Sequence, residues 1–257
     1  TNLTTAIIGQ GTQDQGDSWD GLVAEVILYT RNITSAERES VEDYLSEKYD
    51  IPVRLLTKAT GGEAISADDA AVSTAFTTLT GPRLQEGFIG ELTQSGTIVL
   101  QAPSGYEWDT GGSNPSASVA AAFGGTTDLA VSFTSRSTSQ ITFTITNAST
   151  TNQGEITFSD LRVRPTTGLL PNTGEITNVG TTGPGGTTSY GTLTMVPGTR
   201  IEMEFTQQPS TSNVSTDINP APRVQFIDQF GNPVEDTGVN VSVSLNQVSG
   251  SGSLTGT

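Results

Sequence analysis

Carboxylates are the side chains in this sequence that are best able to do acid–base or metal-binding chemistry, because the chain contains no histidine and no cysteine. Without these two residue types it cannot form a Ser-His-Asp triad, a Cys-His pair or a zinc site with imidazole or thiolate ligands. Asp14, Asp17 and Asp20 are spaced three residues apart in a polar stretch, and hard oxygen ligands of this kind bind calcium. Their spacing differs from that of an EF-hand loop, so we interpret them as turn residues and keep calcium as the alternative.

Glu25 is the remaining candidate for acid–base chemistry, since only paired carboxylates are left for this work in such a composition. It interrupts the apolar run "AEVILY", and no second carboxylate accompanies it in a Glu-x-Asp-x-x-Glu pattern. We therefore predict that Glu25 is structural and pairs with Arg31 or Arg38. For the whole chain we predict no catalytic, cofactor-binding or metal-binding residue and no enzyme activity.

The charge balance argues against a nucleic-acid partner. The chain has 27 acidic and 11 basic residues and a formal net charge of −16, whereas a phosphate-binding surface needs clustered lysine and arginine. Asp68 with Asp69 and Glu235 with Asp236 are weaker calcium candidates than the first aspartates. No run of about 18 apolar residues is present, so we expect no membrane insertion. The acidity predicts a soluble protein in an extracellular or cell-surface setting.

Three aromatic side chains have the size and shape to stack on sugar rings. These are Trp19, Tyr106 and Trp108, and in a thin sandwich such residues more often pack in the core. Asn-x-Ser/Thr sequons, which a glycosylating host would recognise, arise easily in a chain this rich in threonine and serine. They occur at Asn2, Asn32, Asn147, Asn213 and Asn240.

The first 55 residues predict one strand and one helix. "GLVAEVILY", residues 21–29, has apolar side chains on both faces and therefore predicts a central strand. A helix over about 35–48 follows, because Thr34 and Glu37 form a capping box and Pro52 stops the helix soon after. One strand and one helix cannot bury these apolar faces alone, so we interpret residues 1–55 as the last part of a domain.

The stretch "WDGLVAEVILYTRNITSAERESVEDYLSEKYDI" resembles the C-terminal end of bacterial laminin-G-like, or concanavalin-like, jelly-roll modules. The resemblance implies that the helix closes a partial jelly roll and that the chain begins inside a longer protein. The positions that match the pattern are Trp19, Asp20, Gly21, Ala24, Glu25, Val26, Tyr29, Arg31, Thr34, Glu37, Arg38, Val41, Glu42, Tyr44, Leu45, Lys48 and Tyr49.

Residues 56–199 predict a complete antiparallel β-sandwich. Short alternating runs such as "TIVLQA", "LAVSF", "QITFTIT", "EITFSDLRVRP" and "YGTLTMV" are separated by turn clusters, and we count roughly eight strands. In "QITFTIT", Ile141, Phe143 and Ile145 share one face. The phrases "IVLQAPSGYEWDT" and "EITFSDLRVRPTTG" resemble repeated β-sandwich modules of very large secreted bacterial proteins.

Residues 200–257 predict the beginning of another β module. "RIEMEFTQQPS" is a first strand, and "PRVQFIDQFGNPVEDTGVNVSVSL" gives two more around a loop, with Val241, Val243 and Leu245 facing inward. In "DQFGNPV" we expect a turn in which Asp228 and Asn232 bond locally, Gly231 supplies φ freedom and Pro233 fixes φ. The stretch resembles bacterial Ig-like modules of the invasin and adhesin type, which implies an incomplete module.

The sequence therefore predicts an all-β protein of tandem antiparallel sandwiches, Ig-like in type, with one short helix. The predicted function is that of a non-catalytic segment of a large modular secreted or cell-surface bacterial protein, acting as a stalk, fibre or adhesin. Neighbouring modules or copies of the same protein are the expected partners. The alternative is a set of carbohydrate-binding modules attached to a polysaccharide-acting enzyme outside this chain, with polysaccharides or cell-surface glycans as partners.

Overall fold

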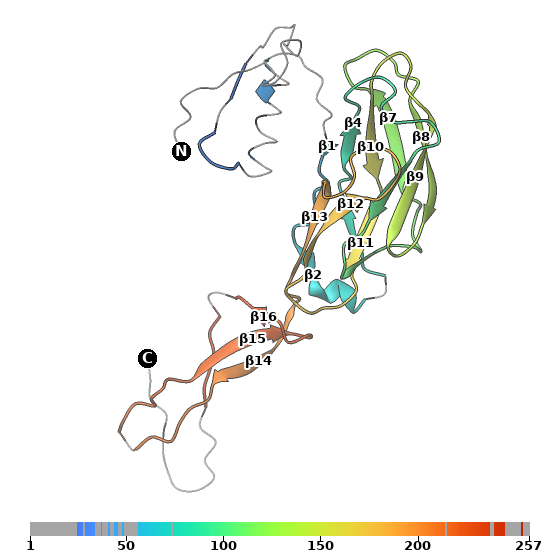
Figure 1. The fold of residues 1–257 in the computed structure, drawn as a ribbon. Coiled ribbons are helices and arrows are strands. Elements are labelled where there is room, and N and C mark those ends of the chain that lie inside the picture. Colours follow the sequence, from blue (N-terminus) through green and yellow to red (C-terminus); the bar gives the residue numbers. More distant parts are fainter. Residues whose placement is uncertain are drawn as a thin grey trace. The chain divides into compact units, whose positions relative to one another are not determined.

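The computed structural model describes residues 56–244 except 73, 214, 237 and 238, together with residues 25–27, 29–33, 37, 41, 44, 45, 48 and 253. The chain divides into two compact units, Thr1–Val53 and Arg54–Thr257 (Figure 1). The predicted domains 56–199 and 200–257 both lie in the second unit.

In the first unit, the described residues of the predicted helix are all helical: Glu37, Val41, Tyr44, Leu45 and Lys48. The predicted central strand is wrong at its described residues. Glu25, Val26, Ile27 and Tyr29 have no strand structure, and the three apolar side chains among them are exposed. A strand needs a hydrogen-bonded neighbour, and none of the described strands pairs with these residues.

The second unit is built from strands, as the sequence predicted. In residues 56–199 they are β1 (Leu56–Thr57), β2 (Ile65–Ser66), β3 (Thr77–Leu79), β4 (Arg83–Gln85), β5 (Thr97–Gln101), β6 (Tyr106–Trp108), β7 (Ser116–Ala121), β8 (Ala130–Arg136), β9 (Gln140–Asn147), β10 (Gly154–Ser159), β11 (Leu161–Pro165), β12 (Thr173–Asn178) and β13 (Ser189–Val196). A short 3-10 helix, η1 (Ala67–Ala70), follows β2. The count exceeds the predicted eight because β1 to β4 and β6 span only two or three residues, too few to show a period.

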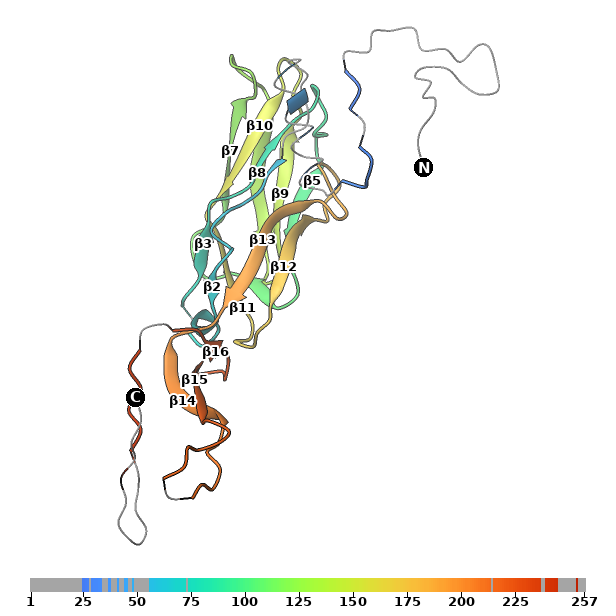
Figure 2. The same ribbon diagram turned by 90° about the vertical axis from the view of Figure 1, so that its left-hand side faces the viewer.

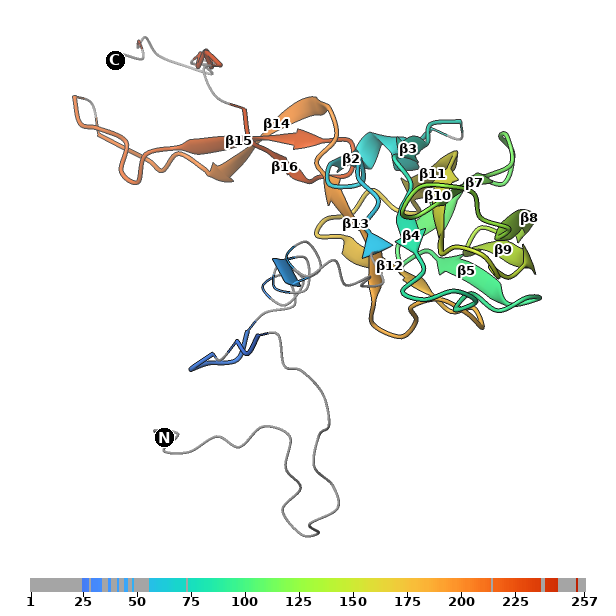
Figure 3. The same cartoon turned by 90° about the horizontal axis from the view of Figure 1, so that it is seen from above.

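These strands form the two layers of a β-sandwich (Figure 3). One layer is the six-stranded sheet β2-β13-β12-β5-β9-β8. The other combines β1-β4-β10-β7 with β3-β11-β6, which are continuous through the successive strands β10 and β11. All strand pairs are antiparallel except β2 with β13. The fold class predicted from the sequence is confirmed as all-β with antiparallel sandwich layers.

The core lies between the two layers. Ile141, Phe143 and Ile145 of β9 are fully buried, which confirms their predicted common face. The Phe143 ring packs across the sandwich on Phe158 of β10, with 4.9 Å between ring centroids. Its other neighbour is Phe133 of β8, at 6.1 Å in an edge-to-face arrangement that aromatic quadrupoles favour.

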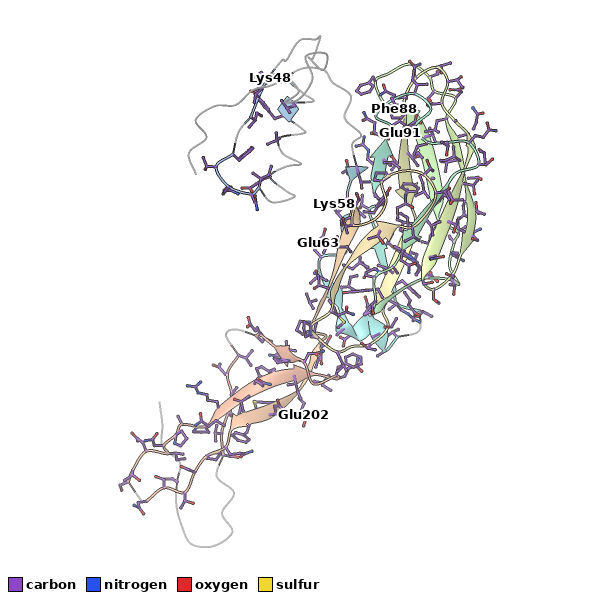
Figure 4. All side chains as sticks on the ribbon, in the orientation of Figure 1. Lys48, Lys58, Glu63, Phe88, Glu91 and Glu202 are labelled. Carbon is purple, nitrogen blue, oxygen red and sulfur yellow. The ribbon has the colours of Figure 1, made fainter. Side chains whose placement is uncertain are left out.

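The chain comes into the sandwich at one end. β1 is antiparallel to β4, with Leu56 opposite Leu84, so β1 begins at the end of the sheet where β4 finishes. The loop after β4 is tied to β10 there, through a 2.9 Å hydrogen bond from the Glu86 N–H to the Gly154 carbonyl. We call this the incoming end. The Phe88 side chain is exposed in its loops (Figure 4).

The chain leaves the sandwich at the opposite end, which we call the outgoing end (Figure 2). β13 runs parallel to β2, with Met195 opposite Ile65, and finishes at Val196 near η1. The loop 166–172 also lies here, since the Met195 N–H donates to the Asn172 carbonyl at 2.9 Å. The chain therefore enters the sandwich at one end and leaves it at the other.

A separate three-stranded sheet follows, formed by β14 (Arg200–Gln207), β15 (Arg223–Asp228) and β16 (Pro233–Val234). β14 is the predicted first strand of this region. The inward-facing strand predicted around Val241 and Val243 is wrong, because residues 241–244 have no regular structure and both valines are exposed. None of the described strands pairs with these residues, and Leu245 lies outside the described part of the chain.

Candidate functional site

The turn between β15 and β16 makes the local bonds that the sequence predicted. The Gly231 N–H donates to the Asp228 carbonyl at 3.0 Å, and the Asp228 N–H donates to the Asn232 carbonyl at 3.0 Å. The carboxylate oxygen Oδ1 of Asp228 also accepts from the N–H groups of Phe230 and Asn232, each at 2.9 Å. Gly231 has a φ of 82°, which glycine adopts without steric cost.

The same two side chains bind the sandwich. Oδ2 of Asp228 accepts from the Gly198 N–H and from the Asn232 side chain, each at 2.8 Å. The Asn232 side-chain amide donates to the Gly168 carbonyl at 2.6 Å and accepts from the Leu170 N–H at 3.0 Å. Asp228 and Asn232 are only 1% and 5% exposed. The turn is therefore buried against the outgoing end of the sandwich.

Phe230, at the tip of this turn, adds an apolar contact. It packs, together with Leu170, against the sandwich core. A Cβ atom on Gly168 would lie 2.2 Å from the Phe230 ring, so only glycine leaves room for the ring at this position. The loop 166–172 consequently receives both hydrogen bonds and an aromatic side chain from the following sheet.

Asp68 of η1 holds the connection from the other side. Its Oδ2 accepts from the Thr199 N–H at 2.6 Å, and its Oδ1 accepts from the Gln229 side chain at 3.0 Å. A Cβ atom on Gly198 would lie 2.1 Å from Asp68 Oδ1, so a side chain at this position would displace the Asp68 carboxylate. We call the set formed by Asp68, Gly168, Gly198, Thr199 and Asp228–Asn232 the junction.

The junction stabilises two carboxylates in their ionised form by hydrogen bonds. Burial would raise the pKa of Asp228, but the bonds from Asn232, Gly198 and Phe230 outweigh it and hold this pKa below its usual range. The Thr199 N–H is the main cause that lowers the pKa of Asp68. Both side chains are therefore charged at neutral pH.

The other acidic candidates do not gather into a cation site. Asp69 accepts from the Thr77 hydroxyl at 3.3 Å, and Asp236 pairs with Arg200 at 2.5 Å. Among the described residues, no three histidine, cysteine, aspartate or glutamate side chains are placed to hold a metal ion. The first calcium candidates, residues 14, 17 and 20, lie outside the described residues.

Among the described residues, Glu25 is bonded to Lys48 and Tyr44 and not to Arg31, one of its two predicted partners. Its carboxylate accepts from Lys48 Nζ at 3.1 Å and from the Tyr44 hydroxyl at 3.3 Å. Arg31 pairs with Glu37 instead, at 2.5 Å, and Arg38 lies outside the described residues. The helix brings Tyr44 and Lys48 to the same face, four residues apart, which explains how both reach Glu25.

The aromatic candidates in the sandwich belong to its core. Trp108 is fully buried and its indole N–H donates to the Leu100 carbonyl at 3.2 Å. The Tyr106 hydroxyl donates to the Asn172 carbonyl at 2.9 Å, and burial raises the pKa of Tyr106 to about 12. Neither ring presents a face to a sugar, so the carbohydrate-binding alternative gains no support from them. Trp19 lies outside the described residues.

The sequons differ in the freedom of their asparagine side chains. The Asn147 amide donates to the Asp128 carbonyl at 2.6 Å and to the Ala148 carbonyl at 3.2 Å. Asn32, Asn213 and Asn240 are exposed. Among the sequons that the structure describes, a host enzyme would therefore meet a hydrogen-bonded asparagine side chain only at Asn147.

Sequence reasoning found the turn but missed its partners. The bonds within residues 228–232 follow from local turn chemistry. Asn232 is 64 positions from Gly168 in the sequence, and Gln229 is 161 positions from Asp68. A local sequence pattern cannot predict hydrogen bonds between residues so far apart.

No protein-family model, curated protein or solved structure matches this chain. The resemblances to laminin-G-like and invasin-type modules therefore stay predictions from the sequence.

Proposed function

We propose that this chain is a non-catalytic, structural segment of a large modular secreted or cell-surface bacterial protein. Its task is to space and present neighbouring modules, with adhesion or fibre formation as the function of the whole protein. The observation that carries the proposal is the path of the chain. It comes into the sandwich at one end, leaves at the other, and meets there a following sheet that is bonded in place.

The short connection supports a stiff spacer. Only Pro197, Gly198 and Thr199 separate β13 from β14. The last two donate their N–H groups to Asp228 and Asp68. Linkers between independent domains are usually exposed and make few contacts across the boundary. Here the linker is itself part of the bonded junction, which limits bending between sandwich and sheet.

The proposed setting and partners follow from the surface and the composition. A net charge of −16 keeps such a chain soluble and self-repelling. None of the helices among the described residues is long and apolar enough to cross a membrane. Neighbouring modules, or further copies of the same protein, are the partners that a spacer of this kind requires.

Electron microscopy of the native, full-length material tests the proposal. Extended or filamentous particles with beaded sandwich-sized modules are the expected result. Compact, isolated globules would contradict a stalk or fibre.

The role of the junction is tested on this chain by small-angle X-ray scattering. Asn232→Ala removes the bonds to Gly168 and Leu170 and should broaden the distribution of interatomic distances. Asn240→Ala, at an exposed position of the same unit, is the matched control and should leave the distribution unchanged. Equal scattering from wild type and both variants would show that these bonds do not stiffen the connection.

A further inference from the structure

The β14–β16 sheet has one apolar face that is partly exposed, although the Arg200 guanidinium lies over the Phe226 ring on this face, 5.0 Å from its centroid. Met203 and Phe205 pair directly with Phe226 and Val224, and Phe226 also pairs with Val234, so these five side chains share a face. Met203 and Phe205 are 43% and 49% exposed. Exposed apolar groups of this size on one contiguous surface mark a place where something binds.

The opposite face of the same sheet carries two glutamates, beside Ile227 and Pro233. Glu204 pairs with Gln225, whose side-chain amide donates to the glutamate at 2.8 Å, and Glu202 is exposed beside them (Figure 4). An apolar, uncharged element would thus fit the face of Met203 and Phe205 better than the face that carries the two glutamates. We call the face formed by Met203, Phe205, Val224, Phe226 and Val234 the open face.

Residues 239–244 have the sequence of a strand but no partner strand in the structure. Valines at 239, 241 and 243 alternate with Asn240, Ser242 and Ser244, a pattern that predicts a strand with one apolar side. Val241 and Val243 are 40% and 66% exposed, and residues 241–244 have no regular structure. The segment carries no charge, which suits the open face.

We propose that residues 239–244 can move from this exposed position to pack in extended form over the open face, with their valines against it. The inference is independent of the proposed function. Val234 lies on the open face, and four residues, 235–238, connect it to Val239. Four extended residues span at most about 13–14 Å. Packed sheets lie about 10 Å apart, so this connection is long enough for the chain to turn back over the face.

The same short connection favours this segment over one from a second copy of the chain. A tethered segment meets its site at an effective concentration in the millimolar range. A second copy reaches such a concentration only in very concentrated solution. The expected occupant of the open face is therefore the segment of the same chain, and its binding should not depend on protein concentration.

Hydrogen exchange on the full chain provides the first test. The amides of residues 239–244 should exchange at least about tenfold more slowly than unstructured amides, because packing against the open face shields them from water. The double variant Val241→Asp with Val243→Asp should lose this protection. Its matched control, Asn240→Asp with Ser242→Asp, adds the same charge on the other side of the segment and should retain it. Unprotected amides in the wild type, or equal loss in both variants, would overturn the proposal.

Disulfide trapping tests the face and the source of the segment. The chain has no cysteine, so introduced thiols have no competitors. Val241→Cys should form an intramolecular disulfide faster with Met203→Cys than with Glu204→Cys, which lies on the opposite face of the sheet. Equal rates would overturn the assignment of the open face. Disulfide-linked dimers that increase with protein concentration would show that a second copy is the occupant and would overturn the proposal as stated.

Discussion

β9 of the sandwich and β14 of the following sheet have the same alternating sequence pattern and opposite burial. The apolar side chains of β9 are fully buried, whereas those of β14 at Ile201, Met203 and Phe205 are exposed. The difference lies in the second layer. β9 faces β10 across the sandwich, but none of the described strands faces β14. An alternating pattern thus predicts a strand, while its burial depends on an element elsewhere in the chain.

The two regions also differ in how far polar groups contribute to their stability. The sandwich is stabilised mainly by apolar side chains between its layers. The β14–β16 sheet is fixed to it mainly by Asp228 and Asn232, through hydrogen bonds to backbone groups. Removing core volume should therefore affect the sandwich globally, and removing a carboxylate should affect the sheet locally.

The largest expected effect is at Phe143. Phe143→Ala should lower the free energy of unfolding by about 3–5 kcal/mol, because it removes a fully buried ring and leaves a cavity. Phe205→Ala in β14 should cost about 1 kcal/mol, since the ring is 49% exposed and only part of it is removed from water. Urea unfolding followed by circular dichroism measures both. Equal losses would remove the difference between the regions.

The next effect is at the junction. Asp228→Ala removes four accepted hydrogen bonds and leaves the Gly198 N–H without its partner, which should cost about 2–3 kcal/mol. The loss should be local: hydrogen exchange should accelerate in β15 and β16 and stay unchanged in β9. Asp217→Ala, at an exposed position before β15, is the control. Acceleration in β9 as well would mean that the sandwich and the sheet unfold together.

The pH dependence of stability distinguishes the contribution of the ionised Asp228 carboxylate from that of the packing around it. The pKa of Asp228 is lowered in the folded state, so its contribution is fully present above the unfolded pKa of about 3.9 and is lost as the pH falls through the folded pKa. The stability difference between wild type and Asp228→Asn should be constant near neutral pH and shrink in acid below about pH 4. Hydrogen exchange of the β15 amides in wild type and Asp228→Asn, measured from neutral pH to below about pH 4, reports this stability difference. A difference that grows in acid would contradict the assigned direction.

Local features of the sequence predicted more of the structure than long-range ones. The face shared by Ile141, Phe143 and Ile145 follows from period-two alternation, and the turn at Asp228 follows from its residue types. The two-residue strands β1 and β2 have no detectable period and form only because their partners are already in place. The hydrogen bond from the Thr199 N–H to Asp68 joins residues 131 positions apart. The sequence indicates it only through Gly198, which precedes Thr199 and lies close to the Asp68 carboxylate.

The smallest expected effects come from two surface ion pairs, one in each region. Arg83 pairs with Glu155 on the sandwich, and Arg200 pairs with Asp236 beside the following sheet. Exposed pairs of this kind are worth about 0.2–1 kcal/mol and weaken in salt. Arg200 also lies over the Phe226 ring, 5.0 Å from its centroid, which adds about 0.5–1 kcal/mol.

Arg200→Ala should therefore cost more than Arg83→Ala, by about 0.5 kcal/mol, when each is measured by the exchange of amides in its own region. In 1 M NaCl the cost of Arg83→Ala should nearly vanish, because its interaction is a screened charge pair. Part of the cost of Arg200→Ala should persist, because the guanidinium still covers the ring of Phe226. If salt removed both costs equally, the contact with Phe226 would contribute nothing, and the two regions would not differ in their surface charges.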